Sequence, residues 1–536
     1  MPGHEELHDN LIHRVNVGDL LTRSAARSPH QMAVVDGDRR FTYRVFNDWV
    51  NRTAHGLLAL GYGRGDALAL MSGNSAEFLV TYFACAKLGI VCVPINLLWK
   101  HGELAYVLEH ARVRGVVLQA SLLPQLATGL DAAKTALDLI VIGRPDAADL
   151  AGFPAGKVLD FAELGQGQPT DEPNRIVGDR DAISYLYTSG TTSAPKGVVS
   201  SHLAIYIEAL GVAIDTRLTN GDRVAAMLPF FHTAQLNAFC TPSIAVGATL
   251  YVLQGFDAAR LLDLIAREKI SVIFGLPVMY RSLLDLQGRE ARDVSSLRMA
   301  VYAMAPMAQD ELRRLIDMFR CDFSLMFGQT EMSPVSAFFR PEHQLTHTGA
   351  AGTPSINAEI AIMDDAGNKL PHGQSGEIVY RSPQALTGYL HNPQATAEAF
   401  RHGWFHSGDV GHFDQDGILW FEDRFKDVIK SGGENVASLE VETALYGADP
   451  RILEAAVVGL PHDRWGEAIT AFVITRGGEA VVEAELLTEI RGRLSPFKCP
   501  KAVIQVAEFP KTATGKVQKV ELRKRHATFY AGRPDS

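Results

Sequence analysis

Hydroxyl side chains, glycines and one lysine are concentrated in residues 188–197, which read Thr-Ser-Gly-Thr-Thr-Ser-Ala-Pro-Lys-Gly. The apolar run 183–187 directly before them is typical of a strand, so the segment is predicted to form a strand-to-loop turn. Backbone N–H groups, hydroxyls and an ammonium are groups that bind phosphate oxygens. The segment therefore predicts a phosphate-binding loop, although the same composition also occurs in solvated surface turns. The candidate phosphate-binding residues are Thr188, Ser189, Gly190, Thr191, Thr192 and Lys196.

The loop differs from the P-loop of NTPases at two positions. Pro195 stands where that motif needs its second glycine, and Gly197 stands where it needs Ser or Thr after the lysine. These departures disfavour a P-loop NTPase.

Four further motifs follow along the chain. Residues 327–331 read Phe-Gly-Gln-Thr-Glu, 404–409 read Trp-Phe-His-Ser-Gly-Asp, 423–435 contain Asp-Arg-Phe-Lys-Asp and Ser-Gly-Gly-Glu-Asn, and 510–516 read Pro-Lys-Thr-Ala-Thr-Gly-Lys. Each is weak alone. In this order and with these gaps, the five motifs resemble those of the adenylate-forming superfamily, which includes acyl- and aryl-CoA synthetases, firefly luciferase and non-ribosomal adenylation domains. The resemblance covers nearly the whole chain.

The resemblance implies an ATP-dependent acid–thiol ligase. Such an enzyme converts a small-molecule carboxylic acid to an acyl-adenylate and then to an acyl-CoA, releasing pyrophosphate and AMP, with ATP, Mg²⁺ and CoA as cofactor and co-substrates. Three alternatives stay open: transfer of the acyl group to an amine or carrier protein, a luciferase-like oxygenase, and a binding protein that has lost catalysis. The intact Lys426 and residues 431–435 favour CoA, and the retained Glu331, Asp409 and Lys516 argue against the binding protein.

The resemblance also implies roles at the nucleotide. Phe327 stacks on adenine, Thr330 contacts the α-phosphate and Glu331 ligates Mg²⁺. Asp409 accepts hydrogen bonds from the ribose, to which Arg424 donates. The catalytic residues implied are Lys516, which bridges carboxylate and α-phosphate, with Thr330, Glu331 and His232. The nucleotide site also includes Ala305, Gly328 and Gln329.

The acid, CoA and hinge residues are implied in the same way. His232 stands at the mouth of the acyl pocket, Lys426 is the hinge of a mobile domain, and Ser431, Gly432 and Gly433 line the pantetheine tunnel. The other predicted pocket walls are Ala234, Gln235, Ala238, Tyr302, Ala303, Met304, Met332 and Val335. Because Ala234 and Ala238 are small, the pocket is expected to accept a hydrophobic fatty or aromatic acid. Ser193 and the segment 302–306 depart from the glycine-containing patterns of the family.

The elements that must position these residues alternate between strand and helix. Strands are predicted at 66–71, 90–94, 271–276 and 298–303, and helices at 77–88, 261–268 and 310–319. A further helix is predicted from the helical spacing of apolar residues between Phe46 and Leu57, with Thr42 as its cap. This alternation predicts an α/β fold with doubly wound sheets. Residues 143–173 are expected to be a surface connection, and a small β region begins at Gly376. The predicted domains are residues 1–425, for ATP and acid, and a mobile α+β domain at 426–536.

Length and composition are those of a globular enzyme with more than one domain. The chain has 536 residues and a formal net charge of −10, which gives no reason to expect nucleic acid as a partner. Five cysteines without a paired spacing indicate buried thiols in a reducing compartment, so a cytoplasmic location is expected. Residues 224–256 lack charged side chains, but their prolines, glycines and polar residues favour a buried pocket lining over a membrane span. The sequence leaves the oligomeric state open, a homodimer included.

Overall fold

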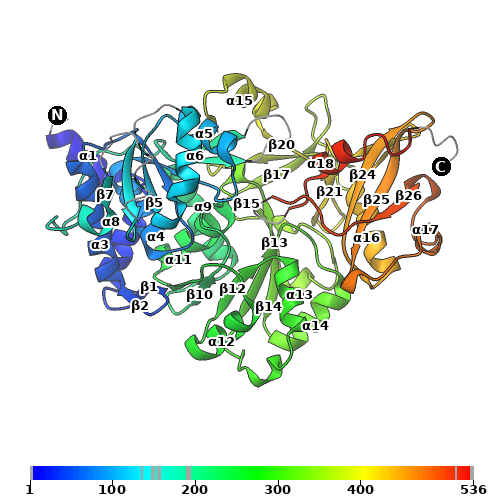
Figure 1. Ribbon diagram of the computed structural model, residues 1–536, viewed down its shortest axis with the longest axis horizontal. Helices are drawn as coiled ribbons and strands as arrows, with labels where there is room; N and C mark the ends of the chain where they lie inside the picture. The colour runs from blue at the N-terminus through cyan, green and yellow to red at the C-terminus, as the bar shows by residue number, and fades with distance from the viewer. Residues whose placement is uncertain are drawn as a thin grey trace. The chain divides into compact units, whose positions relative to one another are not determined.

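The computed structural model describes residues 4–133, 137–145, 150, 153, 158–188, 195–512 and 516–531. By contacts, the chain divides into two compact units (Figure 1): unit 1 contains Met1–Ile360 and Tyr380–Phe405, and unit 2 contains Ala361–Val379 and His406–Ser536. The predicted small β region therefore packs with the C-terminal part of the chain. The predicted domain boundary at residue 426 was placed at the expected hinge of a mobile domain. A division by contacts does not test motion, so this boundary stays a prediction.

Unit 1 contains an eight-stranded sheet with the order β19-β9-β8-β4-β3-β5-β6-β7. From β8 to β7 its neighbouring strands are parallel, whereas β9 and β19 join it in antiparallel register. Its strands are β3 (Ala67–Met71), β4 (Val91–Pro94), β5 (Val113–Gln119), β6 (Asp138–Ile142), β7 (Val158–Asp160), β8 (Ala182–Thr188), β9 (Lys196–Ser201) and β19 (Gly388–Tyr389).

A nine-stranded sheet of the same unit has the order β16-β15-β14-β13-β12-β10-β11-β1-β2. Strands β14 to β1 are parallel along this path, and β2, β15 and β16 are antiparallel. Its strands are β1 (Met32–Asp36), β2 (Arg39–Thr42), β10 (Arg223–Ala226), β11 (Thr249–Val252), β12 (Val272–Gly275), β13 (Met299–Ala303), β14 (Asp322–Gly328), β15 (Val335–Phe339) and β16 (Thr353–Pro354).

Helices connect these strands, and several begin at side-chain caps. Thr42 accepts from Val45 N at the start of α3, as predicted, and Ser75 accepts from Phe78 N at the start of α4. The α-helices of unit 1 are α1 (His4–His13), α2 (Gly18–Arg27), α3 (Tyr43–Ala59), α4 (Ala76–Leu88), α5 (His101–His110), α6 (Leu123–Ala133), α8 (Phe161–Leu164), α9 (His202–Asp215), α10 (Thr233–Gln235), α11 (Thr241–Val246), α12 (Ala258–Glu268), α13 (Pro277–Asp285), α14 (Gln309–Phe319) and α15 (Pro393–Ala399). A π-helix, η2 (Leu236–Cys240), follows α10, and short 3₁₀ turns are η1 (Ala120–Leu122), η3 (Arg289–Ala291), η4 (Thr330–Met332), η5 (Pro341–His343) and η6 (Arg401–Gly403).

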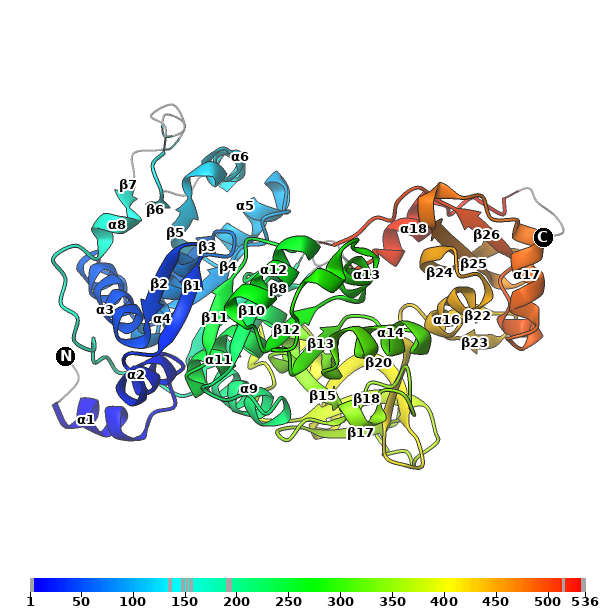
Figure 2. The same cartoon turned by 90° about the horizontal axis from the view of Figure 1, so that it is seen from below.

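The alternation of side chains along β3 shows how unit 1 is layered. Leu68 and Leu70 face a core shared with the nine-stranded sheet and with helices such as α3 and α4, whereas Ala67, Ala69 and Met71 face a second core with α5 and α6. Helices α12–α14 lie against the strands of the nine-stranded sheet (Figures 1 and 2). Both sheets are thus buried by helices, which is the doubly wound arrangement that the sequence predicts.

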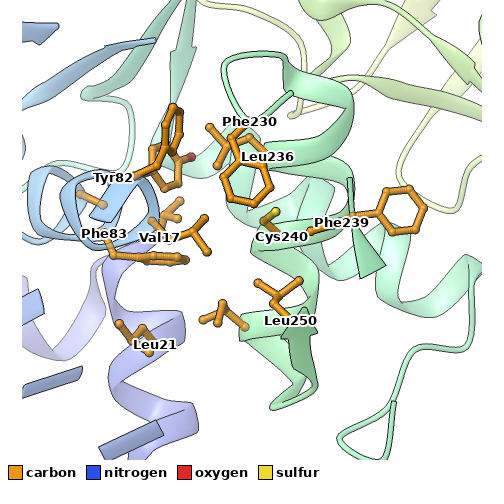
Figure 3. Packing of buried hydrophobic residues seen from close by; sticks show 14 of the residues in the cluster. Val17, Leu21, Tyr82, Phe83, Phe230, Leu236, Phe239, Cys240 and Leu250 are labelled. Atoms are coloured by element: carbon orange, nitrogen blue, oxygen red, sulfur yellow. The ribbon is translucent and has the colours of Figure 1, made fainter. Parts of the chain in front are cut away.

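Residues 224–256, the longest apolar segment, lie in the first of these cores. Phe230, Leu236 and Cys240 point toward α2 and α4 (Figure 3), and Phe78 contacts Phe230 with ring centroids 5.6 Å apart. Phe239 points the other way and stacks on Phe274, with ring centroids 4.4 Å apart. The segment is divided into β10, α10, η2, α11 and β11. Among the described helices, none combines the length and the apolar character that a membrane crossing requires.

Unit 2 is an α+β unit whose main sheet contains a long antiparallel pair. Strands β24 (Ile452–His462) and β25 (Gly466–Thr475) pair over most of their length, joined by β22 (Ile429–Ser431), β23 (Glu434–Val436) and β26 (Ala502–Gln505). The helices are α16 (Ser438–Ala448), α17 (Glu483–Arg491) and α18 (Lys519–Arg525), with 3₁₀ turns η7 (Arg476–Gly478) and η8 (Pro496–Lys498). A four-stranded sheet precedes them, formed by β17 (Glu359–Met363), β18 (Gly376–Arg381), β20 (Phe405–Phe413) and β21 (Leu419–Arg424).

Two expectations differ from the structure in detail. The connection 143–173 contains β7, which extends the eight-stranded sheet, and α8, whose Phe161 and Leu164 are buried in the core. Of the five free cysteines, four are buried and Cys321 is half-buried.

Candidate active site

The two ends of the predicted phosphate loop lie opposite each other in a hairpin. Thr188 ends β8 and Lys196 begins β9, and the two are paired across the strands. The predicted residues Ser189, Gly190, Thr191 and Thr192 lie outside the described residues. The structure therefore places the two paired strand ends from which the loop starts and returns, with the Lys196 ammonium at the returning end.

Tyr389, from the two-residue strand β19, contacts two of the predicted site residues. Its hydroxyl donates to Glu331 Oε1 at 3.0 Å, and Lys196 Nζ lies 4.8 Å from the centroid of its ring. Glu331 stands in η4, and its backbone oxygen accepts from Leu386 N at 2.7 Å. Lys196 and Glu331, which are far apart in the sequence, are thus brought together around one tyrosine.

The nucleotide residues Phe327, Gly328 and Gln329 lie where β14 ends, and Ala305 follows the neighbouring parallel strand β13. Carboxyl ends of parallel strands are the usual ligand-binding edge of such sheets. At Gly328 an added Cβ would stand 1.8 Å from the Pro334 oxygen, so no other residue fits. Gln329 Nε2 is buried and has no hydrogen-bond partner among the described residues. This edge therefore presents a donor that no described residue uses.

Two buried side chains fix the loop that carries Thr330 and Glu331. Gln384 Nε2 donates to the backbone oxygens of Met332 and Val335, and its own backbone oxygen accepts from Ser333 Oγ at 2.8 Å. From α9, Glu208 Oε1 accepts from Val335 N at 3.0 Å. Burial raises the pKa of the Glu208 carboxyl well above its usual range, with a smaller contribution from Asp215. The loop is thus held by hydrogen bonds from two buried side chains.

His232 caps the short helix α10. Its Nδ1 accepts from Ala234 N at 3.2 Å, which leaves Nε2 to carry the ring proton. Burial lowers the pKa of His232 to about 4, so the ring is neutral at physiological pH. It offers a neutral N–H donor and no charge.

The other predicted acyl-pocket residues differ in what they expose. Gln235 is buried and engaged within its own segment, because Oε1 accepts from Leu228 N at 3.0 Å and Nε2 lies 3.9 Å from Cys240 Sγ. The Tyr302 hydroxyl donates to Gln344 Oε1 at 2.8 Å. Met304 is 46% exposed and has a left-handed backbone with φ of 75°, which costs a non-glycine residue about 1 kcal/mol or more. The remaining members, Ala234, Ala238, Ala303, Met332 and Val335, are buried.

In unit 2, the predicted ribose-binding residues form an ion pair across β20 and β21. Arg424 Nε lies 3.0 Å from Asp409 Oδ1, and the two residues are register partners. Lys516 belongs to the same charged group: although its side chain keeps exposed surface, desolvation by the surrounding protein and the positive charge of Arg424 lower its pKa to about 8. Desolvation and Arg424 also lower the pKa of Lys426. Unit 2 thus gathers the cations Arg424, Lys426 and Lys516 with the carboxylates Asp409 and Asp427.

The predicted tunnel residues lie at the turn between β22 and β23. Ser431 ends β22, and both Gly432 and Gly433 have positive φ, of 62° and 90°. Gly432 N donates to the Trp465 oxygen at 2.9 Å, and a Cβ on Gly432 would stand 3.0 Å from the indole ring. These glycines are therefore required by the turn itself.

Sequence reasoning missed Tyr389, Gln384 and Glu208. A two-residue strand gives no periodicity, and the pairing of Tyr389 with Val198 joins segments that are remote in the chain. Glu208 carried a usable signal, because a carboxylate inside the apolar pattern of α9 indicates a buried partner.

Glu331 suits a Mg²⁺ site. It supplies a half-buried carboxylate oriented by Tyr389, beside the cation Lys196. Within the described ranges, no group of three or more His, Cys, Asp and Glu side chains could hold a metal. A cation here would take its other ligands from phosphate and water, which is how Mg²⁺ is commonly bound.

Comparison with known proteins supports the enzyme class that the sequence motifs predict. The AMP-binding enzyme family matches residues 21–390, and the AMP-binding enzyme C-terminal domain matches residues 440–516. The chain is 35% identical to a feruloyl-CoA synthase of Amycolatopsis sp over 95% of its length and 99% of that protein. It is 32% identical to the long-chain-fatty-acid–CoA ligase FadD13 of Mycobacterium tuberculosis, over 96% and 99% of the two chains.

Solved structures agree with the fold. The anthranilate CoA ligase AuaEII, in complex with anthranoyl-AMP, superposes with a TM-score of 0.87 at 28% identity, covering 97% of this chain and 99% of that one. The predicted fold class, enzyme class and requirement for ATP, Mg²⁺ and CoA are confirmed, and transfer to an amine or carrier protein is not favoured. The chain belongs to the AMP-binding enzyme family, in its branch of acyl- and aryl-CoA ligases.

Proposed function

We propose that this enzyme activates a hydrophobic carboxylic acid, aromatic or fatty, as the acyl-adenylate and transfers it to CoA. One observation carries the proposal: Lys196 and Glu331 converge on Tyr389 in a chain that aligns end to end with CoA ligases. An aromatic acid is the first choice, because one relative is a feruloyl-CoA synthase and one solved neighbour holds an aromatic acyl-AMP.

In the first half-reaction, the carboxylate oxygen of the acid attacks the α-phosphorus of ATP and pyrophosphate leaves. Lys196 and the loop 188–192 would neutralise the triphosphate, and Thr330 would donate to the α-phosphate. Glu331 would hold Mg²⁺, which supplies charge neutralisation at the phosphate oxygens when bound. Phe327 would stack on adenine, with Ala305, Gly328 and Gln329 completing that side of the site.

On the acid side, we assign orientation to His232. A neutral imidazole with its proton on Nε2 can donate one hydrogen bond to the substrate carboxylate without pairing with its charge. The carboxylate therefore keeps its nucleophilic oxygen. The buried apolar residues Ala234, Ala238, Ala303, Met332 and Val335 would contact the hydrophobic part of the acid, and the exposed Met304 would stand at its entrance.

Unit 2 would supply the charges that change between the two steps. Lys516 would stabilise the charge that develops at the α-phosphate, and the Asp409–Arg424 pair would bind the ribose. Rotation about Lys426 would then remove Lys516 and bring the turn of Ser431, Gly432 and Gly433 to the pantetheine chain. The CoA thiol attacks the acyl carbon, and AMP is the leaving group.

The compartment and assembly are proposed on separate grounds. Five free cysteine thiols are compatible with a reducing compartment, so we place the reaction in the cytoplasm. A homodimer stays a prediction, and sedimentation of the purified chain would decide it.

Product formation across a panel of acids tests the proposed function. Pyrophosphate and AMP release are measured with ferulate, other aryl-propenoates, benzoates and straight-chain acids, each with and without CoA. We expect CoA-dependent AMP release with aromatic or medium-to-long aliphatic acids and little with acetate. Acetate as the best substrate, or AMP release that needs an amine in place of CoA, would contradict the proposal.

A further inference from the structure

Tyr389 is the one side chain described above that contacts both a proposed phosphate cation and the proposed metal ligand, and the predicted site did not include it. Its hydroxyl donates to Glu331 Oε1 at 3.0 Å, and its ring faces Lys196 Nζ at 4.8 Å. The role inferred for Tyr389 rests on the proposed function, because it concerns how these two charges bind nucleotide and metal.

The hydrogen bond from the Tyr389 hydroxyl fixes the orientation of the Glu331 carboxylate. A carboxylate has two oxygens, and donation to Oε1 sets the rotation of the group and leaves Oε2 for another ligand. Carboxylates that ligate metals are commonly hydrogen-bonded from outside in this way, and the outer partner sets both orientation and metal affinity. The backbone of Glu331 is held separately, by Leu386 N. Tyr389 therefore acts on the side chain alone.

The ring contact acts on Lys196. An ammonium within about 6 Å of a ring centroid is attracted to the electron-rich face. Donation of the phenol proton to a carboxylate polarises the ring further, so the two contacts reinforce each other. Lys196 and Glu331 have opposite charges, and a direct ion pair would use both. Because both side chains contact the tyrosine, the Lys196 ammonium can still bind phosphate and the Glu331 carboxylate can still bind a metal ion.

The position of Tyr389 is set by backbone pairing. It is opposite Val198 in β9, Leu390 N donates to Gly197 O at 2.8 Å, and Tyr389 N donates to Thr396 Oγ1 at 2.9 Å. Because β9 begins at Lys196, the same strand pairing positions both the ammonium and the ring. Neither contact depends on an exposed, freely rotating segment.

We propose that Tyr389 is a positioning residue for nucleotide–metal binding: its hydroxyl orients Glu331 for Mg²⁺, and its ring holds Lys196 for the β- and γ-phosphates. Removal of the hydroxyl alone will weaken the metal-dependent part of nucleotide binding. Removal of the ring as well will also weaken the metal-independent part.

Calorimetric titration of the full-length enzyme with α,β-methylene-ATP, which cannot be cleaved at the reacting bond, separates the two parts. The Kd is measured with Mg²⁺ and with EDTA for the wild type, Tyr389→Phe and Tyr389→Leu. Tyr62→Phe is the matched control, because the Tyr62 hydroxyl also donates to a carboxylate, Asp138, at 3.1 Å, remote from the site. Thermal unfolding of each variant reports folding.

For Tyr389→Phe we expect the gain in affinity due to Mg²⁺ to fall by roughly 10–100-fold, with the EDTA value unchanged. Tyr389→Leu should lose a further two- to fivefold, approximately, in EDTA, because Lys196 loses its ring. Tyr62→Phe should match the wild type. If Tyr389→Phe binds like the wild type, or loses equal affinity with and without Mg²⁺, the positioning role is wrong while the proposed function stands. A wild type that binds no nucleotide overturns both.

Discussion

The candidate site residues of unit 1 and unit 2 differ in how strongly their protonation depends on pH near neutrality. In unit 1, His232 is neutral, burial raises the pKa of Glu208 and so favours its protonated form, and Lys196 and Glu331 share one tyrosine. In unit 2, three cations lie together with Asp409 and Asp427, and desolvation with mutual repulsion lowers the pKa of Lys516 and Lys426. Unit 1 therefore presents a site whose charge is fixed near neutral pH, and unit 2 presents one whose charge titrates.

This difference suits a two-step reaction. Groups that bind ATP and acid throughout the cycle need constant charge and a rigid setting, which buried hydrogen bonds provide. Groups that act in one step and then leave must not be bound too tightly. A lysine with a lowered pKa is poised for that role, since its ammonium is stabilised only when phosphate is near.

The largest effect is expected from removal of the titrating cation. Lys516→Ala should slow acyl-adenylate formation on the order of 10²–10³-fold, because the ammonium stabilises charge in that transition state. Thioester formation from pre-made acyl-AMP should be little changed. Pyrophosphate exchange and single-turnover thioester formation measure the two steps. Lys511→Ala, in the same segment but engaged with Glu454 at 2.6 Å, is the control; equal losses in both steps would refute the division of roles.

A change at the predicted hinge should affect the opposite step. Lys426→Pro fixes φ and should slow thioester formation on the order of 10²-fold while leaving adenylation intact, because only the second step needs the moved unit. Lys426→Ala keeps backbone freedom and should slow neither step to that extent. The same two assays apply. Undiminished thioester formation in a folded proline variant would exclude this hinge.

The neutral setting of unit 1 can be tested at Glu208. Glu208→Leu leaves Val335 N without its acceptor and should reduce the free energy of unfolding by about 1–3 kcal/mol. Glu208→Gln keeps the acceptor and should be tolerated. Because burial raises the pKa of Glu208, its folded form holds a proton that the unfolded chain loses above pH 4.5, so this residue favours folding less as pH rises.

Urea unfolding at several values between about pH 5 and pH 8 measures how the free energy of unfolding depends on pH. The stability of Glu208→Gln relative to the wild type should grow with pH. A difference in stability between the two proteins that stays constant from about pH 5 to pH 8 would show that Glu208 is ionised in the folded state over this range.

A smaller effect is expected at the acyl pocket. Each additional buried methylene of the acid should raise kcat/KM about fourfold until the pocket is full, equivalent to about 0.8 kcal/mol. Ala234→Trp should shift the preference toward shorter acids and leave the KM for ATP unchanged. A chain-length series with one aryl-propenoate, measured on both proteins, tests this. An unchanged ranking would place the pocket elsewhere.

Much of the fold of unit 1 follows from local sequence signals. Leu68 and Leu70 alternate with Ala67, Ala69 and Met71, and Thr42 caps its helix as expected.

The rest depended on contacts between remote segments. Nothing near Tyr389 in the sequence indicates that β19 will pair with β9, because two residues show no period. Gln235 was predicted to line the acyl pocket, which stays a prediction, and its side-chain amide accepts a hydrogen bond from Leu228 N and contacts Cys240 Sγ. A polar side chain can satisfy its hydrogen bonds toward a ligand or within its own segment, and sequence does not distinguish the two. Part of the small β region belongs to unit 2 through contacts between segments, which local patterns do not encode.

The pH dependence of the two half-reactions tests the contrast between the units most directly. The pKa of Lys516 is lowered to about 8, so the role in adenylation that we propose for its protonated form predicts that kcat/KM for ATP declines as pH rises through about 8. Lys516→Arg should move that decline to higher pH, because a guanidinium stays charged. Thioester formation from pre-made acyl-AMP should lack the decline. The account is contradicted if both steps decline together near pH 8, or if Lys516→Arg leaves the adenylation profile unchanged.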